Sequence, residues 1–144
     1  MPLTVEKIES GTVIDHIRAG LGMRVLQMIG VGTGYAGRVA LLMNVPSKRI
    51  GKKDMLKIEG KHIDEKTIDK ISLISPDATI NLVKGGEVIE KRNVKMPSEL
   101  RGAFKCPNPK CITNMEKVDT RFRVEKAGLR CRYCERVFKA DELV

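Results

Sequence analysis

The sequence predicts an α+β protein in two parts: a ferredoxin-like antiparallel sheet with two helices over residues 1–97, and a small all-β domain over residues 98–144. Short β-branched runs alternate with two helical patterns in the first part, and two adjacent glycines join a pair of these runs as in a hairpin. The second part holds all four cysteines and is too short to bury a sufficient core without a cross-link or a metal.

The first strand and the first helix are expected near the N-terminus. A β-branched run at residues 12–17 follows the turn residues Ser10 and Gly11. Over residues 19–30, apolar side chains recur at helical spacing, and Gly30 stands where a C-terminal cap belongs. A strand followed by a helix is therefore expected.

Two strands are expected next, over residues 38–45 and 54–58, because each run has the length and composition of a strand. Pro46 is expected to end the first, Gly60 follows the second, and a polar loop over residues 47–51 separates them.

The second helix is expected to begin after Asp64, which can cap it, and to end before Pro76. The runs 79–84 and 87–91 flank Gly85-Gly86 and predict the hairpin. This order of elements predicts a sheet with both helices on one face. A linker is expected over residues 93–100.

Length and charge restrict the possible functions. A chain of 144 residues makes one ordinary domain or two small ones, which excludes a large multidomain enzyme. The net charge of +9 suits an anionic partner, but five aromatic residues and no Trp disfavour an extended base-stacking surface. There is no apolar run long enough to cross a bilayer and no signal-peptide pattern, so we expect a cytoplasmic protein without a membrane partner.

The cysteines form two close pairs. Four residues separate Cys106 from Cys111, two separate Cys131 from Cys134, and 19 lie between the pairs. Two such pairs brought together by a hairpin supply the tetrahedral thiolate ligands of zinc, and four thiolates leave no open position for catalysis. We therefore expect one structural zinc ion. Two disulfides or four unrelated thiols are the alternatives, and the clustering in a reducing compartment disfavours both.

Two other motifs suggest chemistry but lack the right context. Gly32, Gly34 and Gly37 have the spacing of a dinucleotide-binding motif, but here a helical pattern precedes and a strand pattern follows, which reverses the required order. Asp15-His16 could suggest a catalytic pair, yet adjacent strand residues are expected to point to opposite faces. No nucleophile is placed to complete a triad, so no catalytic residue is expected.

Several blocks of the sequence, in order along nearly the whole chain, closely resemble the regulatory chain family of aspartate carbamoyltransferase. They are Gly11-Thr-Val-Ile-Asp-His-Ile17, Gly51-Lys-Lys-Asp-Met-Leu-Lys-Ile-Glu-Gly60, Pro76-Asp-Ala-Thr-Ile-Asn81 and the cysteine pairs in Cys106-Pro-Asn-Pro-Lys-Cys111 and Cys131-Arg-Tyr-Cys-Glu135.

The resemblance implies a non-catalytic regulatory subunit. Its N-terminal domain would bind CTP or ATP as allosteric effectors in control of pyrimidine biosynthesis, and its zinc domain would dock on the catalytic chain. Regulatory chains of this family pair as homodimers, and two catalytic trimers join three such dimers.

The resemblance also implies the residues of the effector site. Lys91 and His16 suit the triphosphate, Asp15 and Lys57 suit ribose hydroxyls, and backbone groups near Ile8 and Gly86 can bind the exocyclic amine of the base. The full expected set is Val5, Glu6, Ile8, Val13, Asp15, His16, Lys53, Lys57, Asn81, Val83, Gly86, Val88 and Lys91.

Two positions depart from the family pattern. Gly86 stands where the family often carries an aromatic residue, which leaves base selectivity open. Lys110 replaces a polar neutral residue in the first cysteine turn, which faces the catalytic chain. The expected docking residues are Asn108, Lys110, Arg132, Glu135 and Arg136.

The main alternative function is a zinc-ribbon protein that binds nucleic acid, which the charge and the thiolate cluster suggest. The sparse aromatic residues and the four-residue spacing of the first pair argue against it. A cysteine-based oxidoreductase is disfavoured further, because all four thiols are explained as metal ligands.

Overall fold

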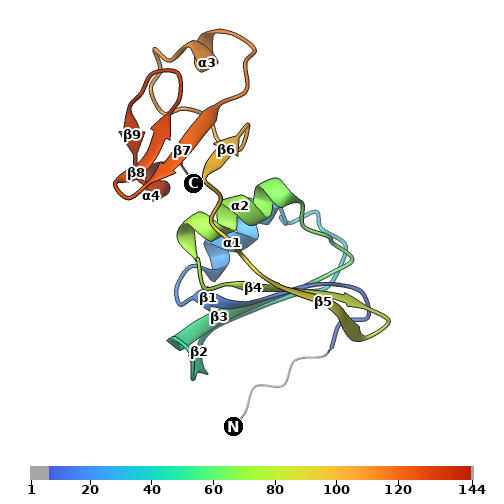
Figure 1. Ribbon diagram of the computed structural model, residues 1–144. Helices are drawn as coiled ribbons and strands as arrows, with labels where there is room; N and C mark the ends of the chain where they lie inside the picture. The colour runs from blue at the N-terminus through green and yellow to red at the C-terminus, as the bar shows by residue number, and fades with distance from the viewer. Residues whose placement is uncertain (1–6, 144) are drawn as a thin grey trace.

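The structure, a computed structural model, describes residues 7–143 and contains two antiparallel sheets (Figure 1). The large sheet has the strand order β2-β3-β1-β4-β5 and the small sheet the order β6-β7-β8-β9. The first four strands and two helices of the large sheet follow each other as β-α-β-β-α-β, which is the ferredoxin-like arrangement. The predicted α+β class is confirmed.

The two parts of the chain have the following elements. The large-sheet region comprises β1 (Gly11–Arg18), α1 (Gly22–Ile29), β2 (Val39–Ser47), β3 (Gly51–Glu59), α2 (Glu65–Ile74), β4 (Thr79–Lys84) and β5 (Glu87–Asn93). The small-sheet region comprises β6 (Glu99–Arg101), α3 (Ile112–Met115), β7 (Arg121–Glu125), β8 (Gly128–Cys131), β9 (Val137–Phe138) and α4 (Ala140–Leu143).

The ends of both long helices follow from local chemistry. Gly30 caps α1 in the left-handed conformation, with φ of 84°, as its position after the apolar repeat predicts. Asp64 caps α2, because its Oδ1 accepts a hydrogen bond of 2.9 Å from the backbone N–H of Thr67. None of the helices within residues 7–143 is long and apolar enough to cross a membrane.

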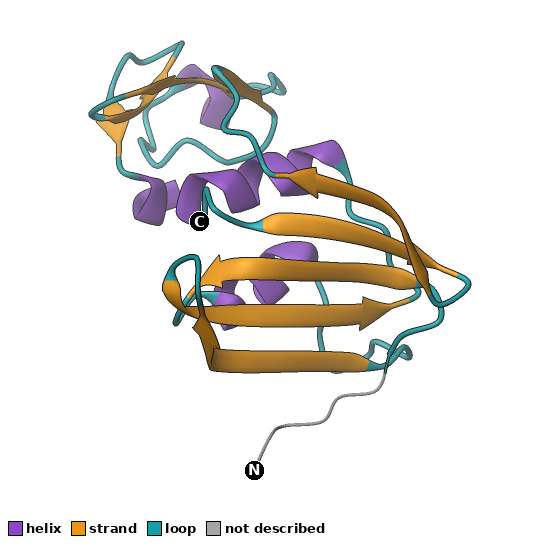
Figure 2. Ribbon diagram, turned by 60° about the horizontal axis from the view of Figure 1, so that its bottom comes forward, coloured by secondary structure: helices purple, strands orange, loops and turns teal. Residues whose placement is uncertain are grey.

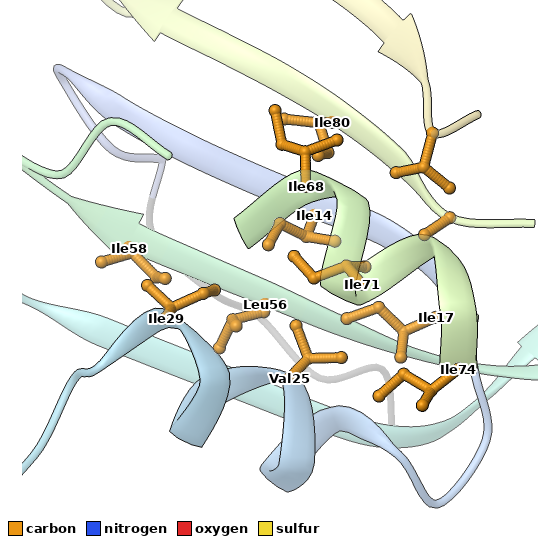
Figure 3. Close-up of a cluster of buried hydrophobic side chains, with 12 residues drawn as sticks. Ile14, Ile17, Val25, Ile29, Leu56, Ile58, Ile68, Ile71, Ile74 and Ile80 are labelled. Atoms are coloured by element: carbon orange, nitrogen blue, oxygen red, sulfur yellow. The ribbon is translucent and has the colours of Figure 1, made fainter. Parts of the chain in front are cut away.

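Both helices cover one face of the large sheet and leave the other face open (Figures 1 and 2). Alternation along the strands sends Ile14, Leu56 and Ile80 to the covered face, where they meet Val25 of α1 and Ile71 of α2 (Figure 3). This apolar layer fixes the register of the strands, because a slip of one residue would expose it. The open face is therefore available for a ligand.

Several expectations for the strands were wrong in detail. The strand expected over residues 54–58 begins at Gly51, and β6 begins at Glu99, inside the expected linker over residues 93–100. Pro46 does not end β2, which continues to Ser47; β2 is an edge strand, where the missing N–H of proline breaks no interior pairing. Strict alternation also fails at two bulges. The register shifts between Ile14 and Ile17 in β1, and again between Leu42 and Val45 in β2.

The small-sheet region packs against α2 (Figure 2). Lys70 of α2 places its Nζ 5.3 Å from the centre of the Phe104 ring, and Leu73 contacts the apolar cluster of the small sheet. Arg24 of α1 also donates a 3.1 Å hydrogen bond to the carbonyl of Asp141. Helix α2 thus has the large sheet on one side and the small-sheet region on the other.

Candidate functional site

A pocket of about 310 Å³ lies on the open face of the large sheet. Its volume is in the range of small-molecule sites. Strands β1, β3 and β4, the β4–β5 hairpin and the segment before β1 contribute to it. The residues that line it are Lys7, Ile8, Val13, Met55, Lys57, Asn81, Val83, Gly86 and Val88.

One row of paired residues crosses this face. Lys57 pairs with Val13, Val13 with Asn81, and Asn81 with Lys91. Directly paired residues of an antiparallel sheet point to the same face. Within this row, which ends at Ala40 of β2, two lysines flank an apolar and an amide side chain.

The pocket contains polar groups without partners. Within residues 7–143, neither Lys7 nor Lys57 forms an ion pair, and the buried Oδ1 of Asn81 has no hydrogen-bond partner. An unsatisfied buried acceptor is costly unless a ligand supplies a donor. Together with the apolar Val13 and Val83, these groups suit a ligand with an apolar ring, amine or hydroxyl donors and negative charge.

The expected effector residues divide into three groups. Those that line the pocket are Ile8, Val13, Lys57, Asn81, Val83, Gly86 and Val88. Asp15, His16, Lys53 and Lys91 lie beside it, and Val5 and Glu6 fall outside the described residues. Lys7 and Met55 line the pocket but were not expected. The alternation that places Lys57 on the open face also places Met55 there, whereas no pattern in the sequence indicates Lys7.

Asp15, His16 and Lys53 form a half-buried polar cluster. Lys53 Nζ lies 2.8 Å from Asp15 Oδ1, and the exposed fractions of the two side chains are only 15% and 18%. The ring of His16 lies 4.0 Å from Asp15 Oδ2 and 3.1 Å from the hydroxyl of Thr79. The prediction that Asp15 and His16 point to opposite faces was wrong, because the β1 bulge gives His16 a φ of 58°.

The four cysteines lie close together where the first cysteine turn approaches the end of β8 and the turn that follows it. The sulfur atoms of Cys106 and Cys134 are 3.8 Å apart, as are those of Cys111 and Cys131. All four lie within 4.8 Å of one another, and the cysteines are free rather than disulfide-bonded. Three of the four are buried. This arrangement can hold one metal ion.

The surroundings of two of these thiols lower their pKa values. Burial opposes ionisation of Cys134, but hydrogen bonds from the backbone N–H of Arg136 and from Asn108 outweigh it and lower the pKa to about 7. Burial likewise opposes ionisation of Cys111, and the hydroxyl of Thr113, 3.2 Å from its sulfur, helps to lower its pKa. Burial raises the pKa of Cys106 and Cys131. A bound cation would supply the missing stabilisation.

The expected docking residues surround this cluster, with one exception. Lys110, Arg132, Glu135 and Arg136 are exposed, whereas Asn108 is 8% exposed. Its Oδ1 accepts a hydrogen bond from the N–H of Lys110, and its carbonyl accepts one from Asn114. Asn108 therefore shapes the turn. Three exposed apolar residues of α3 and the segment after it were not expected, namely Ile112, Met115 and Val118.

Comparison with known families gives two matches that together span nearly the whole chain. Residues 3–95 match the allosteric domain of the aspartate carbamoyltransferase regulatory chain, and residues 98–144 match the metal-binding domain of the same chain. The effector pocket expected from the resemblance and the thiol cluster fall in the first and second matched segments respectively.

Individual relatives are similar over almost their full length. The aspartate carbamoyltransferase regulatory chain of Thermococcus kodakarensis is 46% identical over 144 residues, covering 98% of this chain and 95% of the relative. The regulatory chain of Saccharolobus solfataricus is 47% identical, with 99% and 92% covered. That of Methanocaldococcus jannaschii is 49% identical, with 93% and 91% covered.

Proposed function

We infer the function of this chain from one premise: it belongs to the family of aspartate carbamoyltransferase regulatory chains. It is thus a regulatory chain with an allosteric and a metal-binding domain, and not the catalytic subunit. We propose that residues 1–97 bind CTP and ATP in one shared site and that residues 98–144 hold zinc and dock on the catalytic chain. In this way the chain regulates pyrimidine biosynthesis, in the cytoplasm.

The observation that carries the nucleotide proposal is the pocket on the open face. Asn81 Oδ1, which has no hydrogen-bond partner in the part of the chain described, is available to a ligand amine or hydroxyl. Lys57 and Lys91 supply cations on either side of Asn81 in the same row. Lys53 is already paired with Asp15, so we assign it to shaping the site. His16 and Lys91 bind the triphosphate, Asp15 and Lys57 bind the ribose, and Ile8 and Gly86 bind the base through their backbones.

Gly86 keeps the base end of the pocket open. Its φ is 78°, a left-handed conformation that glycine adopts without strain, and a Cβ added there would meet no atom within 4 Å. We propose that this open space accommodates either a pyrimidine or a purine ring. This geometry supports competition between CTP and ATP for one site.

Zinc fits the thiol cluster. A tetrahedral zinc ion with Zn–S bonds of about 2.3 Å would set its sulfur ligands about 3.8 Å apart. Both closest sulfur pairs have a separation of 3.8 Å. Four cysteine ligands fill the coordination shell, so the ion has a structural role. Cys106, Cys111, Cys131 and Cys134 would hold it, and it would fix the cysteine turns relative to β7 and β8.

The surface around the metal turn fits a protein partner. Ile112 and Val118 are 41% and 38% exposed, and Met115 is 72% exposed. Exposed apolar side chains in the segment that follows charged Lys110 resemble the apolar centre and polar rim of protein interfaces. We assign the catalytic chain as the partner of this surface, in an assembly of two catalytic trimers with three regulatory dimers.

The two edges of the large sheet differ in a way that supports one mode of dimerisation. Strand β5 carries four charged residues among seven, which discourages pairing with another strand. Strand β2 carries none among its nine residues and exposes Val39 and Met43. We propose that β2 is the edge at which two regulatory chains form the homodimer.

Calorimetric titration of the zinc-loaded chain with CTP tests the nucleotide proposal. Lys57→Ala should weaken CTP binding by about tenfold to about a hundredfold, because a hydrogen bond to a charged group contributes about 1.5–3 kcal/mol. Prior saturation with ATP should abolish the CTP signal. Lys52→Ala is the matched control, since this exposed lysine of β3 lies outside the pocket, and it should leave the affinity within about twofold.

Two results would contradict the proposal. One is that neither nucleotide binds. The other is that the chain binds RNA with an affinity that falls steeply as salt rises, which is the signature of many phosphate contacts and would favour the nucleic-acid function. In the assembled enzyme, a bisubstrate analogue at the active site should change CTP affinity by a coupling energy of about 1–3 kcal/mol.

A further inference from the structure

Strand β3 is flanked on both sides by bulges at the same level of the sheet. In β1 the bulge contains His16, with φ of 58°, and in β2 it contains Asn44, with φ of 61°. Beyond the bulges, Ile17 pairs with Asp54 and Val45 pairs with Lys53. Side chains other than glycine rarely adopt this left-handed conformation, so each bulge needs contacts that hold it.

A carboxylate holds each bulge. The backbone N–H of His16 donates a 2.7 Å hydrogen bond to Asp15 Oδ1, and the backbone N–H of Asn44 donates a 2.9 Å hydrogen bond to Asp54 Oδ1. The second oxygen of Asp54 accepts hydrogen bonds from the N–H groups of Gly20 and Gly22, at 3.0 and 2.8 Å. Asp54 therefore joins the β2 bulge to the start of α1.

Asp54 is wholly buried and is paired with N–H groups rather than with a cation. Its exposure is 0%, and no ion pair to it occurs among residues 7–143. A Cβ at Gly22 would lie 2.9 Å from Asp54 Oδ2, so the glycine is needed for this approach. A buried carboxylate with three donors allows little movement of any one donor without movement of the others.

The neighbouring residue connects this cluster to the other face of the sheet. Lys53 pairs with Asp15 on the open face, whereas Asp54 points to the helix-covered face, because successive strand residues alternate. A displacement of β3 at this level moves both side chains. The link thus runs from His16 through Asp15 to Lys53, along the backbone of β3 to Asp54, and from there by a hydrogen bond to Asn44 on edge strand β2.

We propose that Asp54 is a positioning residue that links the nucleotide site to the bulge of edge strand β2, through the Asp15–Lys53 pair on one face and the Asn44 backbone on the other. The proposal rests on the nucleotide function proposed above. A nucleotide that engages Asp15 and His16 shifts the pair with Lys53, and the shared strand carries this shift to the hydrogen bonds of Asp54. The β2 edge then differs between the free and the nucleotide-bound chain.

Amide hydrogen exchange of the zinc-loaded, full-length chain tests the link without a mutation. Ligand binding slows exchange throughout a domain by stabilising it, so Val94, whose N–H donates to the carbonyl of Ala78, reports this general effect. Saturating CTP should slow the Asn44 amide by about fivefold more than the Val94 amide. Equal slowing at the two amides overturns the proposal.

A substitution provides the second test. Asp54→Asn keeps the shape of the side chain but replaces one acceptor oxygen with a donor, so at least one of the three N–H groups loses its partner. Since coupling is reciprocal, CTP affinity should fall by about three- to tenfold with the binding stoichiometry unchanged. The control, Ile71→Val, removes buried volume from the same core and should leave CTP affinity within about twofold, because the native state remains dominant.

The outcomes separate the two proposals. If the unaltered chain does not bind CTP, the nucleotide function is wrong and the link to Asp54 is wrong with it. If the chain binds CTP but folded Asp54→Asn binds it as tightly, the link alone is wrong. If Asp54→Asn fails to fold, the exchange measurement on the unaltered chain still tests whether the nucleotide site is linked to the β2 bulge.

Discussion

The two domains are stabilised in different ways. The allosteric domain buries a continuous layer, mostly isoleucine, leucine and valine, between strands β1, β3 and β4 of the large sheet and its two helices. The metal-binding domain has a small cluster in which three of the buried side chains, Cys106, Cys111 and Cys131, belong to the thiol cluster that we propose holds the metal ion. We therefore expect its core to be incomplete without the ion, whereas the core of the allosteric domain depends on packing alone.

The two domains therefore differ in their sensitivity to substitution. In the allosteric domain, the functional groups on the open face can change without loss of the core, because the two faces of the sheet hold different side chains. In the metal-binding domain, the metal site and the core are one structure. The largest expected effects of single substitutions are therefore in the second domain.

Loss of a metal ligand should have the largest effect. Cys131→Ser, at a wholly buried position, should release the ion and unfold the metal-binding domain, since structural zinc contributes about 10–16 kcal/mol of apparent binding free energy. Resolved amide resonances should collapse for residues 99–138 and persist for residues 11–93. The same variant should no longer bind catalytic trimers. Metal content and two-dimensional NMR spectra provide the measurement.

Thr113→Val is the matched control for that variant. It removes the hydroxyl near the sulfur of Cys111 but keeps all four ligands. Metal affinity should fall by about ten- to a hundredfold, and the domain should stay folded in excess metal. A folded, metal-free Cys131→Ser domain would contradict this difference between the domains, because the core of the metal-binding domain would then be complete without the ion.

A cavity in the allosteric core should have the next largest effect. Ile71→Ala should lower the free energy of unfolding of this domain by about 2–5 kcal/mol, because Ile71 is fully buried between α2 and the sheet. Denaturant unfolding measures the loss, and a metal assay across the same titration follows the other domain. Unchanged metal retention would show that the two domains unfold independently.

The opposite result would show that the two domains unfold together. If Ile71→Ala also lowers the denaturant concentration at which metal is lost, the domains form one cooperative unit. The contacts of Lys70 with Phe104 and of Leu73 with the small-sheet cluster make α2 the element that would couple them. Lys70→Ala in the Ile71→Ala background should then separate the two transitions.

Local chemistry explains which parts of the fold were predictable from the sequence. Asp64 and Gly30 mark helix ends because their side chain or conformation acts within one turn, and Gly85-Gly86 marks a hairpin for the same reason. The bulges at His16 and Asn44 were not predictable, because both depend on strand β3: Asp54 accepts the hydrogen bond of the Asn44 N–H, and Lys53 pairs with Asp15, which accepts that of the His16 N–H. Asp54, in the run Lys52-Lys53-Asp54, has the sequence context of a surface charge but is wholly buried.

The two candidate sites also differ in how far the sequence alone predicts them. Spacing alone indicated the metal cluster, because its ligands come in two close pairs that tight turns bring together. The pocket draws on separate strands and on the β4–β5 hairpin, and its residues were expected only through family resemblance. Lys7 was missed, because its place depends on how the segment before β1 lies against the sheet.

Removal of the α2 cap should have the smallest effect and should depend on pH. Asp64→Ala should lower the free energy of unfolding of the allosteric domain by about 1 kcal/mol at neutral pH, the usual contribution of an N-cap. The hydrogen bond from Thr67 holds the pKa of Asp64 below its ordinary value of 3.8. A carboxylate with a lowered folded-state pKa contributes stability above its unfolded-state pKa and loses it as the pH falls through the folded-state pKa.

Denaturant unfolding of the unaltered chain and of Asp64→Ala at several pH values should therefore give free energies of unfolding that converge in acid. Metal retention by the second domain should be unaffected at neutral pH. A difference that persists below the folded-state pKa would mean that helix propensity or packing, rather than the charged cap, accounts for the role of Asp64.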